Sequence, residues 1–277
     1  MIKSIRGDYL KKMNLFNSVP TFKVQNMVEL QLLSTSKGNQ RKWLFNDNYV
    51  KEQFYYQDKY WRDDLVERIA SVIGKQLETS NFVLEQSLCL IEDNNNSTLC
   101  GVYSKDFLSP GEEYVSVQRM LEANNLSFDT RMGCVERYDF IRSFLESKTG
   151  LEFGAYLDTM ILLDYLVGNE DRHLNNFGVI HKNGKFKYSP LFDFGLGLFE
   201  HDMKYACIPF KQCLTKMECK PFSIDNQKIM DYRLTDGLRL KLPDKIDLSE
   251  CEIPSAKAGS YLRNRCMHLG IILEGVE

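Results

Sequence analysis

The sequence predicts an α+β protein built from two lobes, and three observations lead to this fold class. The chain has 277 residues, which is long enough for two lobes of unequal size. Its front part contains short apolar segments broken by polar turns, whereas the remainder has mainly helical patterns. Strands and helices that are segregated along the chain are typical of α+β folds. We expect one lobe over residues 1–105 and the other over residues 106–277.

The first lobe contains a predicted hairpin, a long helix and two further strands. Residues 41–45 and 49–54 flank Asn46-Asp47-Asn48, which is a turn signal. The helix is indicated by apolar residues at spacings of three and four, which form one buried stripe. These residues are Trp61, Leu65, Ile69, Val72, Ile73 and Leu77. Strands are expected over 82–91 and 98–104, on either side of an Asn/Asp loop.

The second lobe is expected to be mainly helical, with helices over residues 112–124, 134–147 and 152–167. A strand pair follows near 177–192, because Asn183-Gly184 between two β-prone segments is a strong hairpin signal. Helical patterns return over 261–273. Residues 200–277 contain no motif that indicates a function.

Composition and charge exclude several classes of protein. The 35 basic and 38 acidic side chains leave a net charge of −3, which argues against a dedicated nucleic-acid binder. No apolar stretch is long enough to cross a membrane, and charged residues interrupt the N-terminus where a signal peptide needs an apolar core. The eight cysteines are dispersed, so we expect reduced thiols rather than zinc ligands. We therefore expect a cytoplasmic protein without a nucleic acid or a membrane as its partner.

A dense polar loop follows the apolar segment 153–167. Gly168 is the expected end of this helix, and Asn169-Glu170-Asp171-Arg172-His173-Leu174-Asn175-Asn176 comes next. Such residues also make ordinary turns. Asp164 lies in the last helical turn, where the helix dipole disfavours an acid, so we expect Arg172 or loop N–H groups to compensate its charge.

The hairpin gives this loop a possible chemical role. With Asn183 and Gly184 as its turn, Asn176 is expected opposite Leu191, and Asp193 lies two residues beyond Leu191 on the same face. Diagonal neighbours of this kind are roughly 7–8 Å apart. Two oxygen ligands at this separation are able to share one Mg²⁺ ion, so Asn176 and Asp193 are the candidate metal ligands.

Asp171 supplies the remaining group that phosphoryl transfer needs. It lies five residues before Asn176 and is expected to approach the acceptor hydroxyl without binding the metal. Asp193-Phe194-Gly195 forms a D-F-G sequence, in which the glycine permits a sharp change of chain direction. The ordered set D-x-x-x-x-N, hairpin and D-F-G therefore favours a nucleotide-dependent phosphotransferase.

The first lobe offers groups for the phosphates of ATP. Lys51 on the second hairpin strand is the candidate phosphate contact, and Glu67 on the following helix is its expected partner. Lys42 is the alternative lysine, because the turn does not fix the register of the hairpin. Upstream, residues 34–42 form a polar turn whose N–H groups and hydroxyls are suited to cover phosphates, although it is not a Walker loop.

These motifs resemble those of the HipA-like serine/threonine kinases, including the compact CtkA-type members. The resemblance rests on G-N-E-D-R-H-L-N-N-F-G at 168–178 and P-L-F-D-F-G at 190–195. It extends to G-N-Q-R-K at 38–42, Y-V-K-E at 49–52, Glu67 and S-K-D-F-L at 104–108. It implies a bilobal protein-kinase-like fold and phosphorylation of protein serine or threonine with ATP and Mg²⁺.

The resemblance also implies a role for each candidate residue. Asp171 is the implied catalytic aspartate, and Asn176 and Asp193 are the implied metal ligands. Lys51 is implied to contact the ATP phosphates and to pair with Glu67. The cofactor-binding residues of the phosphate-covering loop and its strand are Gly38, Asn39, Gln40 and Lys42.

The resemblance also bears on the substrate and on alternative activities. Some family members autophosphorylate a serine in the loop equivalent to 34–38, where Thr35 fits best, so the protein itself is one expected substrate besides an unidentified protein. The chain is shorter than full-length HipA toxins, so antitoxin-style association with DNA is not implied. D-R-H-x-x-N before D-F-G is also similar to phosphatidylinositol kinases. A lipid or small-molecule kinase, a nucleotide-binding pseudokinase and an AMP transferase remain alternatives.

Overall fold

A computed structural model describes residues 19–30, 40–56, 59–129, 131–199, 205, 208–215 and 217–276. It has the predicted α+β architecture, and the chain divides into two compact units. Unit 1 comprises residues 1–60 and 87–105, and unit 2 comprises residues 61–86 and 106–277. The predicted division at 105/106 assigns residues 61–86 to the first lobe. Their contacts instead place them in unit 2.

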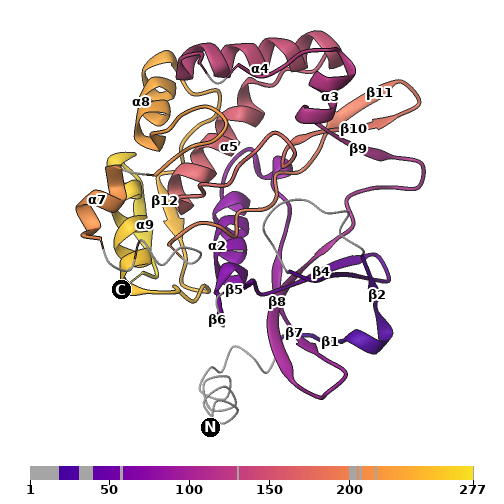
Figure 1. Cartoon of the computed structure of the whole chain (residues 1–277). Coiled ribbons are helices and arrows are strands. Elements are labelled where there is room, and N and C mark those ends of the chain that lie inside the picture. Colours follow the sequence, from indigo (N-terminus) through magenta and orange to yellow (C-terminus); the bar gives the residue numbers. More distant parts are fainter. Residues whose placement is uncertain are drawn as a thin grey trace. The chain divides into compact units, whose positions relative to one another are not determined.

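Unit 1 is built on a six-stranded sheet with the order β1-β7-β8-β4-β3-β2 (Figure 1). The strands are β1 Thr21–Lys23, β2 Val28–Glu29, β3 Lys42–Phe45, β4 Asn48–Glu52, β7 Ser87–Glu92 and β8 Thr98–Lys105. β1 and β7 pair in parallel, and the other pairs are antiparallel. A short pair, β5 Tyr55–Tyr56 and β6 Lys59–Tyr60, and a 3₁₀ turn at Val24–Asn26 complete the described part. Its core contains Trp43, Val50, Cys89, Ile91 and Leu99.

The predicted hairpin at β3 and β4 is confirmed. Phe45 pairs with Asn48, and Asn46 takes the left-handed conformation with φ 48° that such a tight turn requires. Lys42 pairs directly with Lys51. Paired residues lie on the same face of a sheet, so the register places both candidate lysines on one face and does not separate them.

Unit 2 is mainly helical and carries a three-stranded sheet with the order β11-β10-β9 (Figure 1). Its helices are α2 Asp63–Lys75, α3 Val117–Ala123, α4 Cys134–Thr149, α5 Gly154–Val167, α7 Phe210–Thr215, α8 Asn226–Asp236 and α9 Ala256–His268, with a 3₁₀ turn at Ser80–Phe82. Its strands are β9 Glu113–Ser116, β10 Gly178–Lys182, β11 Lys185–Tyr188, and the parallel pair β12 Lys245–Asp247 and β13 Ile272–Glu274.

Helix α5 forms the centre of the unit 2 core. All its residues except Ala155 are buried, and it packs against α2, α8 and α9. The predicted stripe of α2 is buried as well. A helix that is apolar all round is stable only where other elements cover it on every side. The end of α5 is therefore a fixed platform for the loop that follows it.

Two helix predictions are wrong in part. Residues 113–116 form β9 rather than the first turn of a helix, because they pair with β10, and α3 begins only at Val117 with Ser116 as its N-cap. The Tyr-Val pair in this strand is β-prone, and the cross-strand partner decides its state. At the other end of the chain, α9 stops at His268, and Ile272–Glu274 pairs with β12.

The predicted hairpin at Asn183-Gly184 is confirmed, but its ladder is shorter than expected. Val179 pairs with Tyr188, and both turn residues have positive φ, 51° and 76°. Leu191 does not stand opposite Asn176; it forms a bridge with Val83 instead. Loop geometry rather than strand pairing must therefore bring the two candidate metal ligands together.

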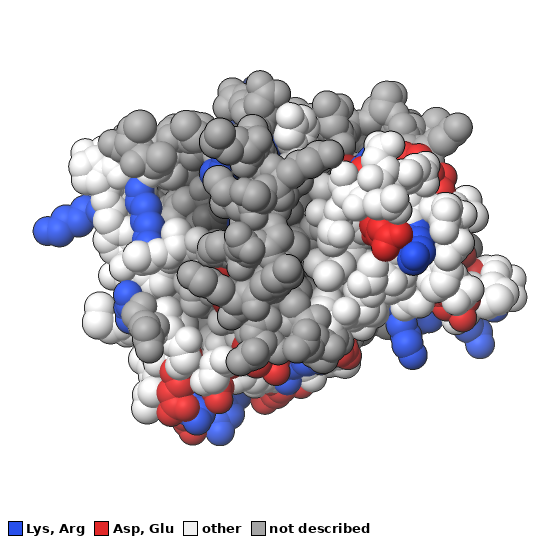
Figure 2. All heavy atoms as spheres, turned by 90° about the horizontal axis from the view of Figure 1, so that it is seen from below, with Lys and Arg blue, Asp and Glu red and all other residues white. Residues whose placement is uncertain are grey.

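The described residues show how charged side chains and apolar helices are distributed in the structure. On the face drawn in Figure 2, acidic and basic side chains of these residues are interspersed, without one large patch of a single sign. Helices long and apolar enough to cross a membrane are absent from the described part of the chain.

Candidate functional site

The polar loop starts at a well-defined helix end. Gly168 has φ 62°, the left-handed conformation of a helix C-cap, and its N–H donates to the carbonyl of Asp164. A side chain at this position would also meet Met217, because an added Cβ would lie 2.8 Å from its Cε. The glycine thus fixes where the chain leaves α5.

A buried ion pair holds the loop against the helix. Arg172 donates from Nε and Nη2 to the two carboxylate oxygens of Asp164, both at 2.9 Å, and both side chains are almost fully buried. Asn169 adds a third hydrogen bond to this carboxylate at 2.8 Å. Burial raises the pKa of Asp164. Burial by itself lowers the pKa of Arg172, but the charge of Asp164, the hydrogen bonds to its carboxylate and the nearby Asp193 together outweigh burial, so the pKa of Arg172 is raised. The expected compensation of Asp164 by Arg172 is confirmed.

Arg172 also joins the loop to the D-F-G segment. Its Nη1 donates to the carbonyls of Asn176 and Phe192, at 3.3 and 2.5 Å. Its guanidinium lies 4.5 Å from the centre of the Phe194 ring, within range of a cation–π interaction. One side chain therefore connects the end of α5 with the backbone beside both candidate metal ligands.

Asn176 and Asp193 meet as predicted, although by another route. Nδ2 of Asn176 donates to Oδ2 of Asp193 at 3.1 Å. The N–H of Asn176 bonds to the carbonyl of His173, and Asp193 has φ 64°. Left-handed backbone at a residue other than glycine costs of order 1–3 kcal/mol and persists where the surroundings enforce it. Here the enforced conformation directs the Asp193 carboxylate to Asn176.

The separation of these two side chains fits a small divalent cation. Neighbouring ligands in an octahedral shell with bonds of about 2.1 Å lie about 3 Å apart. The 3.1 Å between the Asn176 amide and the Asp193 carboxylate matches this value, and rotation of the amide brings its oxygen toward the same point. Clusters of three or more His, Cys, Asp or Glu side chains suited to a metal are absent from the described residues. The pair thus fits Mg²⁺ that takes its other ligands from phosphate and water.

Asp171 is bonded to Asn176 through its backbone. Its backbone N–H donates to Oδ1 of Asn169 at 3.3 Å, and its carbonyl accepts from Nδ2 of Asn176 at 3.4 Å. The residue is exposed to solvent. His173 lies within the loop, where Nδ1 accepts from the N–H of Asn175 at 3.3 Å. The loop thus presents one accessible carboxylate whose backbone is bonded to a candidate metal ligand.

Helix α2 contacts the D-F-G segment directly. Oε2 of Glu67, which is fully buried, accepts from the backbone N–H of Phe194 at 3.0 Å. An added Cβ at Gly195 would lie 3.1 Å from Cβ of Asp63, so a larger residue there would displace the helix or the loop. The expected ion pair of Glu67 with Lys51 joins residues of different units and stays a prediction.

The predicted phosphate-covering residues belong to unit 1. Gly38, Asn39 and Thr35 lie outside the described residues. Gln40 donates from Nε2 to the carbonyl of Glu52 at 2.6 Å. Arg41 binds the Glu52 carboxylate through Nε at 3.1 Å and Nη2 at 2.8 Å. These contacts anchor the chain on β4 beside Lys51. Successive strand residues point to opposite faces, so the Arg41–Glu52 pair lies on the face opposite the one that Lys42 shares with Lys51.

Sequence reasoning missed a group of residues on β9 and the preceding segment. Tyr114 donates to the carbonyl of Asn175 at 2.9 Å, and Ser116 to its side-chain oxygen at 3.1 Å. Phe107 stacks on Phe192 with 5.9 Å between ring centres, and the ring of Tyr114 lies 5.6 Å from that of Phe192. Burial raises the pKa of the Tyr114 hydroxyl. Once residues 113–116 are assigned to a strand, their alternation reveals this contact with the loop.

Comparison with known proteins gives structural matches of low identity. No protein-family model matches the chain, and no curated protein sequence is similar to it. The kinase CtkA of Helicobacter pylori matches 68% of this chain with 20% identity and a TM-score of 0.49. HipA in the HipA–HipB–operator DNA complex of Shewanella oneidensis matches 96% with 16% identity and a TM-score of 0.43.

A third match is a choline/ethanolamine kinase family protein of Mesorhizobium loti, with 9% identity, a TM-score of 0.25, and coverage of 96% of this chain and 83% of that one. The matches with CtkA and HipA cover 64% and 62% of those chains, less than two thirds of their length. The chain is thus similar, at low identity, to structures of the HipA and CtkA proteins that its motifs resemble.

Proposed function

We propose that this protein is an ATP- and Mg²⁺-dependent kinase that phosphorylates serine or threonine in proteins. The observation that carries the proposal is the meeting of Asn176 and Asp193 at 3.1 Å, with the exposed Asp171 in the same loop. A carboxylate oxygen, an amide that can turn its oxygen to the same point, and an exposed carboxylate in the same loop are the groups that phosphoryl transfer needs.

Each side chain has a separate task in this reaction. Asn176 and Asp193 would hold Mg²⁺, and the ion would neutralise charge on the phosphates. Asp171 orients the acceptor hydroxyl and takes its proton. The hydroxyl oxygen then bonds to the γ-phosphorus while the bond to the β,γ-bridging oxygen breaks, which leaves ADP. Positioning and electrostatics are the main sources of the rate.

The supporting residues keep these groups in place. Arg172, Asp164 and Asn169 form a buried, hydrogen-bonded set behind the loop, and Glu67 holds the Phe194 N–H. Low mobility of such a scaffold reduces the cost of aligning the reacting groups. Lys51, with Lys42 as the alternative, is proposed to bind the phosphates from unit 1.

Incubation with γ-³²P-labelled ATP and Mg²⁺ tests the proposal. The reactions contain the protein alone, the protein with casein, and the protein with phosphatidylinositol vesicles, each repeated with Asp171→Asn. We expect label on serine or threonine of protein, lost in the variant and with EDTA. Label on lipid would indicate a lipid kinase. ATP binding without any transfer would indicate a pseudokinase. An AMP adduct in intact-mass analysis would indicate an AMP transferase. Each of these outcomes contradicts the proposed reaction.

A further inference from the structure

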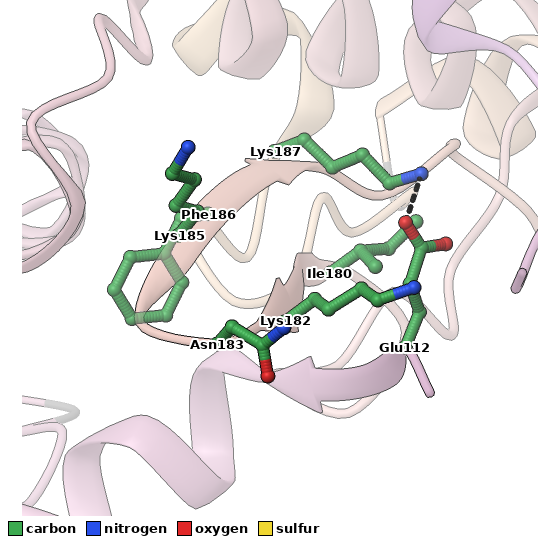
Figure 3. A pocket seen from close by; sticks show the side chains of 7 residues that line it. All are labelled: Glu112, Ile180, Lys182, Asn183, Lys185, Phe186 and Lys187. Atoms are coloured by element: carbon green, nitrogen blue, oxygen red, sulfur yellow. Dashed lines mark ion pairs between the residues drawn. The ribbon is translucent and has the colours of Figure 1, made fainter. Parts of the chain in front are cut away.

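One face of the β9–β10–β11 sheet carries a cluster of lysines. Lys182 on β10 pairs with Lys185 on β11, and Lys187 pairs with Ile180. Since paired residues and residues two apart share a face, all three lysines lie on one side of the hairpin. They line a cavity of about 340 Å³ (Figure 3).

Positive charge exceeds negative charge in this cavity. Among the described residues that line it, Glu112 is the only carboxylate; it binds Nζ of Lys187 at 2.8 Å and the Ser109 N–H at 2.8 Å. Figure 3 shows Lys182 and Lys187 both extending toward Glu112, and Nζ of Lys182 also donates to the Pro110 carbonyl at 2.7 Å. Lys185 makes no ion pair or hydrogen bond with the residues that the structure describes. Each ammonium group thus keeps donors for an anionic ligand.

The lysine face is continuous with the candidate active site. Tyr114 pairs with Ile180 and lies on the same face as the lysines, and its hydroxyl binds the catalytic-loop carbonyl of Asn175. Ile180, with 3% exposure, provides an apolar part of the cavity lining on this face. A chain segment that lies along this face therefore leads toward the loop that carries Asp171.

We propose that this lysine face docks an acidic, extended segment of the protein substrate. Lysines are mobile point charges, so they accept carboxylates at varied spacing rather than one planar group. Strand β11 lies at the edge of its sheet, and lysines on an edge strand disfavour pairing of the strand's backbone with another strand. We therefore expect the lysine side chains, rather than the backbone, to bind the segment. The docking role rests on the proposed kinase function, whereas the affinity for acidic peptide does not.

Fluorescence anisotropy with a fluorescein-labelled hexaglutamate peptide measures this affinity. We expect Lys182→Gln, Lys185→Gln and Lys187→Gln each to weaken binding by about two- to fivefold at low salt, since each removes one exposed charge interaction. Lys228→Gln on α8, an exposed lysine outside the cavity, is the control and should leave the affinity unchanged. Salt should weaken binding to the parent more than to the lysine variants.

Glu112→Gln provides a test that loss of folding cannot imitate. It removes the competing carboxylate, so it should tighten hexaglutamate binding by about two- to fivefold. Unchanged or weaker binding in Glu112→Gln, or equal losses in Lys228→Gln and the cavity variants, would overturn the proposal. Equally lysine-dependent binding of a labelled single-stranded oligonucleotide of the same charge would overturn the assignment to a peptide.

Kinetics then connect the face to the reaction. Two acceptor peptides share one serine-containing core and differ only in a hexaglutamate or a hexaserine extension. We expect the acidic extension to lower KM by several-fold with little change in kcat, and Lys185→Gln to remove this advantage. A KM advantage that persists in Lys185→Gln would contradict docking. Absence of transfer to either peptide, with intact hexaglutamate binding, would instead refute the kinase function and leave the anion site in place.

Discussion

Arg172 shows how one buried side chain organises the candidate site. Its guanidinium donates hydrogen bonds to Asp164 and to two backbone carbonyls, and it also lies over the ring of Phe194. Buried ion pairs of this kind contribute little net stability, but loss of one partner leaves an uncompensated charge. The arginine thus matters most for the position of the loop.

Replacement of Arg172 by alanine tests this role. We expect a loss of about 3–5 kcal/mol in the free energy of unfolding, because Asp164 is left buried without its counter-charge. Urea denaturation followed by circular dichroism gives this value. Arg131→Ala removes an arginine that is 90% exposed and should have little effect. A similar effect of both substitutions would show that the buried pair is not special.

Asp171→Ala tests the acceptor-orienting carboxylate. The side chain is exposed, so its loss should leave the fold and ATP binding intact. Transfer should fall by about a hundredfold or more, as for removal of a general base. Single-turnover phosphoryl transfer and ATP affinity are measured on the same samples. Comparable transfer by the variant and the parent would remove Asp171 from the mechanism.

At the residue scale, the sequence predicts polar groups better than their contacts. Asn176 and Asp193 were expected to meet through a strand register that the structure does not have, and loop geometry brings them together instead. The Asp164–Arg172 pair was predicted, because the helix dipole disfavours an uncompensated acid at that position. The hydrogen bond from Phe194 N–H to Glu67 was not, because it joins residues far apart in the chain and leaves no local pattern.

At the element scale, the β10–β11 hairpin is the feature that connects the two halves of the site. It carries the chain from Asn176 to Asp193 and presents the lysine face. Its Asn-Gly turn was predicted because few residues tolerate two successive left-handed conformations. The strand β9 was not, since short β-prone segments and helix starts share patterns, and only pairing with β10 decides between them.

Gly184→Ala measures how much this turn contributes. An added Cβ meets nothing within 4 Å, so the cost arises from the φ of 76° alone. We expect a loss of about 1–2 kcal/mol in the free energy of unfolding. Gly133 is the control, because its φ of −66° is a conformation that alanine adopts readily. Gly133→Ala should therefore lower the free energy of unfolding by less than Gly184→Ala does. Equal costs would mean that the turn conformation does not strain an alanine.

At the scale of the whole molecule, the sequence predicts the α+β class and the segregation of its parts. The strand-rich unit 1 and the mainly helical unit 2 follow from periodicities of two and of 3.6 residues. Membership of α2 in unit 2 could not be predicted this way, because an apolar stripe shows that a helix is covered but not by which element.

If Asn176 and Asp193 hold Mg²⁺, the protein should bind ATP more tightly when Mg²⁺ is present. Calorimetric titration of ATP into the parent, Asp193→Ala and Asn176→Ala, each with Mg²⁺ and with EDTA, measures this most directly. The parent should bind ATP several-fold more tightly with Mg²⁺, and this difference should vanish in Asp193→Ala and shrink in Asn176→Ala. Equal ATP affinity of the parent with Mg²⁺ and with EDTA would contradict the central claim that Asn176 and Asp193 hold a catalytic cation.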